Sequence, residues 1–222
     1  MNEFIFIIHI LLVVIFLLLA LRLGKNYLLA LVCLQAIIAN LFVVKQIDLF
    51  SRIVTPTDVF IIGTFLGENL LQEYFGKEEA NKAIKISFFS MIFFLVMSKI
   101  QILYQPSAFD TMHSSFKNIL SNSPRIIVSS ILVFFFVQKF DLIFFGFLKK
   151  IFNEKHFVFR LTISALLMQL LDTVLFTFLA LKGIASSLFD IILFSFIIKA
   201  TVILLTTPFM RFSKKMVKAS NE

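Results

Sequence analysis

Long apolar runs alternate with short charged segments along the whole chain of 222 residues. A helix needs about 20 mostly apolar residues to cross the hydrocarbon core of a bilayer. Runs of this kind cover residues 4–21, 27–44, 57–75, 83–104, 124–148, 157–181 and 188–212. None of them alternates with the period of two that a membrane β-strand requires. The pattern therefore predicts a single all-α transmembrane domain over residues 1–222, a bundle of about seven helices.

The composition supports an integral membrane protein. Hydrophobic residues make up 59% of the chain, which includes 31 Phe, and the mean hydropathy is +0.98. Soluble domains are roughly half apolar. The first run begins with Glu3 in place of the basic patch of a secretory signal, so we expect it to remain as a helix. The one cysteine, Cys33, lies inside the second run and has no partner for an intrachain disulfide.

Basic residues are distributed unevenly between the segments that join the runs, and this predicts an orientation. Most of the 21 Lys and Arg fall on the side of the carboxyl terminus. Lys and Arg concentrate in cytoplasmic segments, so we expect an amino terminus outside and a carboxyl terminus in the cytoplasm. Attraction of these residues to the inner leaflet accounts for the net charge of +8 without a nucleic-acid partner. They are Arg22, Lys25, Lys77, Lys82, Lys85, Lys149, Lys150, Lys155, Arg160, Arg211, Lys214, Lys215 and Lys218.

The fifth and sixth runs share an order of polar residues: Arg, then Ser, then Gln-x-x-Asp. The residues are Arg125, Ser129, Ser130, Gln138 and Asp141 in the fifth run and Arg160, Ser164, Gln169 and Asp172 in the sixth. Positions i and i+3 share one face of a helix, so each Gln lies on the same face as its Asp. Consecutive membrane helices run antiparallel, and paired halves are common in transporters. The pattern favours a shared pocket or pore.

Several charged and amide side chains lie inside the apolar runs. They include Asn40, Glu68, Asn69, Gln72, Glu73, Asp141, Asp172 and Lys199. A carboxylate near mid-bilayer costs at least about 2.5 kcal/mol and usually faces a bundle interior or a water-filled cavity. Asp172 and Lys199 therefore allow two interpretations, a buried ion pair that holds helices together or part of a substrate site. For the amides and hydroxyls, the alternative to a site is hydrogen bonding between helices.

Sequence motifs for enzymatic chemistry are absent. The chain contains no HExxH, GxSxG, paired cysteine or phosphate-binding glycine loop. We therefore expect no enzyme, no metal and no other cofactor. Three classes remain: a secondary transporter or channel, a substrate-capturing module of a larger complex, and a packing protein without a ligand.

The segment "ENLLQEYFGKEEANKAI", residues 68–84, resembles a pattern of the queuosine precursor transporter family, whose members are similar to vitamin uptake transporters. "QKFD", "RLTISALLMQLLDTVLFTFLAL" and "FIIKATVILLTTP" resemble features of later helices in the same family. The likeness covers roughly residues 27–212. Family members commonly have about six helices, so the first run is an addition that moves the amino terminus outside.

The resemblance implies ATP-independent import of a 7-deazaguanine base, such as queuine, preQ1 or preQ0, through a bacterial inner membrane for tRNA modification. The edge of such a base carries N–H donors beside a carbonyl acceptor, which suits a carboxylate next to an amide or ammonium group. The candidate substrate-binding residues are Asp172, Gln169, Asp141, Gln138, Lys199, Glu68, Asn69, Glu73, Gln72, Asn40, Arg125, Arg160 and Phe176. Phe176 is a candidate for stacking on the ring.

Two questions about partners stay open at this point. The alternative function is that of a substrate-binding subunit in an energy-coupling vitamin transporter complex. Such subunits typically carry small residues spaced by three in an early helix, to dock the partner, and "FIIHILLVVIFLLL" has none. A homodimer is a further arrangement to consider.

Overall fold

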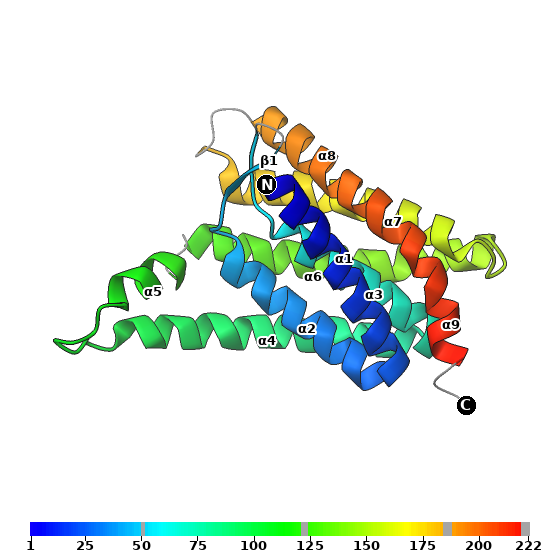
Figure 1. Ribbon diagram of the computed structural model, residues 1–222, viewed down its shortest axis with the longest axis horizontal. Helices are drawn as coiled ribbons and strands as arrows, with labels where there is room; N and C mark the ends of the chain where they lie inside the picture. The colour runs from blue at the N-terminus through cyan, green and yellow to red at the C-terminus, as the bar shows by residue number, and fades with distance from the viewer. Residues whose placement is uncertain (50–51, 121–123, 184–187, 219–222) are drawn as a thin grey trace.

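The computed structural model describes residues 1–49, 52–120, 124–183 and 188–218. Its helices are α1 (Asn2–Leu23), α2 (Lys25–Phe42), α3 (Asp58–Phe75), α4 (Lys77–Leu103), α5 (His113–Leu120), α6 (Pro124–Ile151), α7 (Phe157–Phe176), α8 (Leu188–Thr206) and α9 (Ser213–Lys218). α7 continues as a π-helical turn, Thr177–Leu181, and α8 as a 3-10 helix, Thr207–Phe212. The strands β1 (Ile47–Leu49) and β2 (Arg52–Val54) form a short antiparallel pair. Figure 1 shows a bundle of long helices around α3. The expected all-α membrane bundle is confirmed.

Six helical segments in the described part of the chain are long and apolar enough to cross a membrane. They are Asn2–Leu23, Lys25–Phe42, Lys77–Leu103, Arg125–Ile151, Phe157–Leu181 and Leu188–Val217. Their outward faces carry large apolar side chains, such as Phe16, Phe93 and Phe140. These faces suit contact with lipid, because the hydrocarbon core offers polar groups no partners.

α3 differs from the other long helices because most of its surface is buried. It packs against α1, α2, α4, α6, α7 and α8, and an unbroken run from Ile62 to Gln72 is buried. Asp58, Glu68 and Glu73 give it three acidic residues in 18. A helix with this composition is tolerated inside a bundle, where other helices supply partners for its polar groups.

Two glycines let α3 approach its neighbours closely. A Cβ atom at Gly63 would lie 2.0 Å from Gln35 Oε1, and one at Gly67 would lie 2.5 Å from Val32 Cγ2. Gly63 and Gly67 are four residues apart and so share a helix face, as small residues do where membrane helices meet. This close packing against α2 places the polar side of α3 toward α6, α7 and α8.

The structure departs from the sequence-based boundaries mainly at three points. α4 begins at Lys77, directly after Gly76, where residue 83 was predicted. Gly76 has a φ of 93°, and acidic residues in the first turn of α4 suit a helix amino terminus. The β1–β2 pair was not predicted. At the other end of the chain, a 3-10 segment with Pro208 in its first turn interrupts the α-helix before it resumes as α9.

Candidate functional site

Polar side chains of α3 make contacts at successive heights along the bundle. An 18-residue helix is about 27 Å long, close to the roughly 30 Å thickness of the hydrocarbon core. Asp58 lies at its start, Thr64 and Glu68 follow toward its middle, and Gln72 and Glu73 lie near its end. Thr64, Glu68 and Gln72 are four residues apart and share one face. α3 therefore carries a polar column through the interior of the bundle.

At the first level, Lys199 on α8 lies between two carboxylates. Its Nζ donates a hydrogen bond of 2.6 Å to Asp172 Oδ2 on α7 and lies 3.9 Å from Asp58 Oδ1 on α3. The side chain of Lys199 is buried. The pairing of Asp172 with Lys199 that the sequence suggested is thus present as a direct contact. Asp58 was missed, because an acid at a helix amino terminus is commonly a simple dipole partner.

At the middle level, Asp141 on α6 is held between α3 and α7. Its Oδ2 accepts a hydrogen bond of 2.9 Å from Asn69 Nδ2, and its Oδ1 accepts a short one from Ser164 Oγ. Glu68 is 3% exposed, and its Oε1 has no hydrogen-bond partner among the described residues. Gln138 Nε2 donates to Thr64 Oγ1 over 3.2 Å. Two carboxylates and several amides therefore meet where three helices cross.

Gln169 on α7 is fully buried, and neither of its amide atoms is paired within the described part of the chain. A buried amide without partners costs free energy, so this side chain is available for a ligand. Asp172 lies one turn away from Gln169 and accepts a hydrogen bond from Lys199 on α8. Asp141 accepts hydrogen bonds from Asn69 on α3 and Ser164 on α7. Over the described residues, no hydrogen bond or ion pair joins the two Gln-x-x-Asp pairs. The two aspartates therefore make their contacts at different levels.

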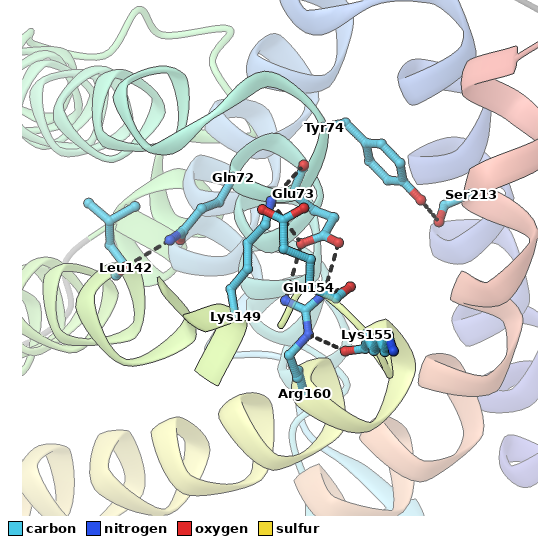
Figure 2. Close-up of polar contacts among 9 residues, drawn as sticks. All are labelled: Gln72, Glu73, Tyr74, Leu142, Lys149, Glu154, Lys155, Arg160 and Ser213. Carbon is cyan, nitrogen blue, oxygen red and sulfur yellow. Dashed lines mark hydrogen bonds and ion pairs between the residues drawn. The ribbon is translucent and has the colours of Figure 1, made fainter. Parts of the chain in front are cut away.

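At the far end of α3, Glu73 and Arg160 form a two-pronged ion pair, shown in Figure 2. Arg160 Nη1 and Nη2 donate to the Glu73 carboxylate over 3.2 and 2.9 Å. Arg160 also donates to the backbone oxygens of Glu154 and Lys155, in the turn between α6 and α7. Lys149 Nζ lies 3.5 Å from the same carboxylate. The sequence had placed both Glu73 and Arg160 among the substrate candidates without pairing them.

Other contacts tie this end of α3 to its neighbours. Gln72 Nε2 donates to the backbone oxygen of Leu142 over 2.9 Å, and the Tyr74 and Ser213 hydroxyls lie 2.7 Å apart, as Figure 2 also shows. The guanidinium of Arg160 lies over the rings of Phe145 and Phe157. Helices α3, α6, α7 and α9 are thereby joined.

Three remaining candidates lie away from the polar column. Asn40 donates to the Ala36 backbone oxygen and accepts a hydrogen bond of 3.2 Å from Ser130. Asn40 and Phe176 line one largely apolar pocket of about 50 Å³ between α2, α4, α5, α6 and α7. Arg125 is exposed and donates to the backbone oxygen of Leu179 over 2.8 Å. None of the three makes a hydrogen bond to Asp141, Asp172 or Lys199.

Together, these contacts define a class of protein. Membrane-crossing helices surround a polar column in which unpaired amides lie between one ion-pair group and another. Within the described residues, no three His, Cys, Asp or Glu side chains gather to hold a metal ion. An enclosed polar interior of this kind is typical of membrane proteins that carry a small polar solute, whose sites lie near the bilayer midplane.

Comparisons with known proteins agree with that class. Residues 57–212 match the family described as "Putative vitamin uptake transporter", and the chain belongs to this family of transporters. A relative from Bacillus subtilis (strain 168), named "Probable queuosine precursor transporter", is 29% identical over 197 residues, which cover 87% of this chain and 86% of the relative. No solved structure matches the chain.

Proposed function

We propose that the protein imports a queuosine precursor, a 7-deazaguanine base such as queuine, preQ1 or preQ0, without ATP. The match to the transporter family and the name of the Bacillus relative support this proposal. The observation that carries it in the structure is the Gln169 side chain, an amide with 0% exposure whose donor and acceptor atoms are both unpaired among the described residues.

The edge of a guanine-like ring has a complementary set of groups. It presents N–H donors next to a carbonyl oxygen, and an amide can donate to that oxygen while a carboxylate accepts from the N–H groups. Gln169 supplies the amide, with Gln138 Oε1 as a second unpaired acceptor. Asp141, on the neighbouring helix α6, is an already oriented carboxylate, because Asn69 and Ser164 both donate to it. We assign ring recognition to these groups.

The two ion-pair groups have a different role in the proposal. Arg160 directs donors to Glu73 and to two backbone oxygens, so four of its five N–H groups are bound within the protein itself. Lys199 is likewise held by Asp172 and Asp58. We assign both groups to closure of the bundle on either side of the site. Release of one group at a time would give the site access to one side of the membrane at a time.

The proposed location is a bacterial inner membrane, with the amino terminus outside and the carboxyl terminus in the cytoplasm. Lys149, Lys150 and Lys155 lie at or just beyond the end of α6, on the side of the bundle where Glu73 meets Arg160. Clustered basic residues are typical of cytoplasmic segments. The Glu73–Arg160 pair would therefore close the cytoplasmic side.

The test is growth of a bacterium that cannot make the base, supplied with each precursor in turn, with queuosine in tRNA as the measurement. We expect at least one precursor to restore queuosine when this protein is produced, and Gln169→Ala to abolish the rescue. Gln101→Ala, at an exposed position of α4, is the matched control and should leave rescue intact. Rescue by no precursor, with the protein present in the membrane, would overturn the proposal.

The role of a binding subunit in an energy-coupling complex is tested separately, by asking whether the purified protein transports without a second subunit. Partner docking in such complexes uses small residues, whereas the outward face of α1 carries bulky ones such as Phe4, Leu12 and Phe16. We therefore expect the purified protein to transport on its own in liposomes. A requirement for a nucleotide-binding subunit would favour the other function.

A further inference from the structure

Glu68 and Asp141 are two buried carboxylates at the same level of the bundle. Their exposed fractions are 3% and 1%, and Asn69, the residue after Glu68, donates to Asp141 across the boundary between α3 and α6. Over the described residues, neither forms an ion pair with a Lys or Arg. Two carboxylates that share a site of low dielectric do not both ionise, so one of them keeps a proton.

The charged groups on neighbouring helices are committed elsewhere. Lys199 on α8 is bound to Asp172, and Arg160 on α7 is bound to Glu73. Lys139 on α6 attracts Glu68 from a distance, but its Nζ donates to Asn81 on α4. Two further titratable groups lie in the surroundings. Cys33 on α2 lies near Glu68, and its thiol accepts a hydrogen bond from Ser87; Lys85 on α4 lies near Lys139. None of them replaces the missing counter-charge.

The hydrogen-bond pattern indicates which of the two acids holds the proton. Asp141 accepts from Asn69 and Ser164, an arrangement that suits an ionised carboxylate. Glu68 Oε1 has no donor among the described groups. Gln138 donates to Thr64 on α3, one turn before Glu68. The Gln138 side chain has 0% exposure, and its Oε1 is unpaired among the described residues. A buried carboxyl group with no donor and no ion pair among the described residues suits the protonated form.

We infer that Glu68, Asp141 and Gln138 form a binding site for one exchangeable proton that enters the cell together with the imported base. The inference rests on the proposed function. Asp141 can receive the N–H groups of the base only when it is ionised, and an ionised Asp141 beside Glu68 requires the proton on Glu68. Base and proton are therefore bound at the same time, which predicts symport.

The experiment uses the full chain in liposomes, with radiolabelled queuine, preQ1 and preQ0 as probes and a pH-sensitive dye inside. The membrane potential is held at zero. With the interior one pH unit more alkaline, we expect wild-type protein to accumulate the transported base up to about tenfold, the limit for one proton per base. Nigericin, which collapses the pH gradient, should abolish accumulation, and adding the base without a gradient should acidify the interior.

Exchange of labelled for unlabelled base at equal pH separates the two proposals. If no probe exchanges, the proposed function fails and the inference fails with it. If exchange occurs but accumulation ignores the pH gradient, or follows a sodium gradient in its place, the proton site is overturned and the transporter function stands. Acidification of the liposome interior on addition of the base tests proton coupling on the wild-type protein alone: acidification supports symport, and its absence during transport overturns it.

Glu68→Gln tests the residue. We expect exchange by this variant to remain measurable, and the tenfold response to the pH gradient to fall to about onefold. Glu78→Gln makes the same change at an exposed position of α4 and should keep the wild-type response. A Glu68→Gln protein that exchanges and still accumulates tenfold would remove Glu68 from the proton site. If that variant does not fold, the dye measurement on the wild-type protein still stands.

Discussion

Loss of the Arg160 guanidinium is expected to destabilise the protein measurably. Arg160 has 0% exposure and donates to Glu73 twice and to two backbone oxygens. Removing one partner of a buried ion pair costs about 3–5 kcal/mol. After Arg160→Met, Glu73 keeps Lys149 at 3.5 Å. We therefore expect Arg160→Met to lower the free energy of unfolding by about 3 kcal/mol, the lower limit of that range.

The partner substitution should cost more. Glu73→Met leaves a fully buried guanidinium with only neutral backbone oxygens and the rings of Phe145 and Phe157 around it. We expect a loss of about 5 kcal/mol, the upper limit for a broken buried pair. The double variant removes both charges at once, so its loss should fall short of the sum of the single losses by up to about 3 kcal/mol.

The assay is thermal unfolding of the detergent-purified protein. For a chain of this length, 1 kcal/mol shifts Tm by about 2–4 °C, so Arg160→Met should lower Tm by roughly 6–12 °C and Glu73→Met by roughly 10–20 °C. Lys150→Met, at an exposed position on the same end of α6, is the control and should change Tm by no more than about 2 °C. Additive losses in the double variant, or an unchanged Tm for Arg160→Met, would refute the reasoning.

Three further changes test other contacts of α3 and its neighbours. Gly67→Ala should lower Tm, at a cost of about 1–3 kcal/mol, because the new Cβ atom would lie 2.5 Å from Val32 Cγ2. Adding Val32→Ala should recover part of the lost stability. No recovery in the double variant would contradict the close approach of the two helices. Asp172→Asn removes the negative charge that Lys199 contacts over 2.6 Å, so it should abolish rescue of queuosine in tRNA while the protein still reaches the membrane. Normal rescue would count against a role in gating. Ser164→Ala removes one of the two hydrogen bonds to the buried Asp141 carboxylate. Denaturant unfolding should therefore show a free energy of unfolding lower by about 1.5–3 kcal/mol. An unchanged unfolding midpoint would show that this hydrogen bond contributes nothing to stability.

The polar residues were visible in the sequence, but their partners were not. Helical periodicity places Gln138 with Asp141, and Gln169 with Asp172, on shared faces. It does not say which neighbouring helix each face meets. Asn69 and Asp141 are 72 residues apart, and Arg160 and Glu73 are 87 residues apart. The sequence therefore could not say that Asp141 bonds toward α3 while Asp172 bonds toward α8.

What the sequence by itself determined was the class of fold. The lengths of the apolar runs dictate membrane helices, because each backbone polar group in lipid must be satisfied within its own segment, and the buried charges of α3, α6, α7 and α8 mark the interior. Only the tertiary structure decided that Arg160 is neutralised by Glu73, that Lys199 lies between Asp58 and Asp172, and that Glu68 forms no ion pair within the described part of the chain. The physical reason is that charges pair across helices, at distances set by packing rather than by position along the chain.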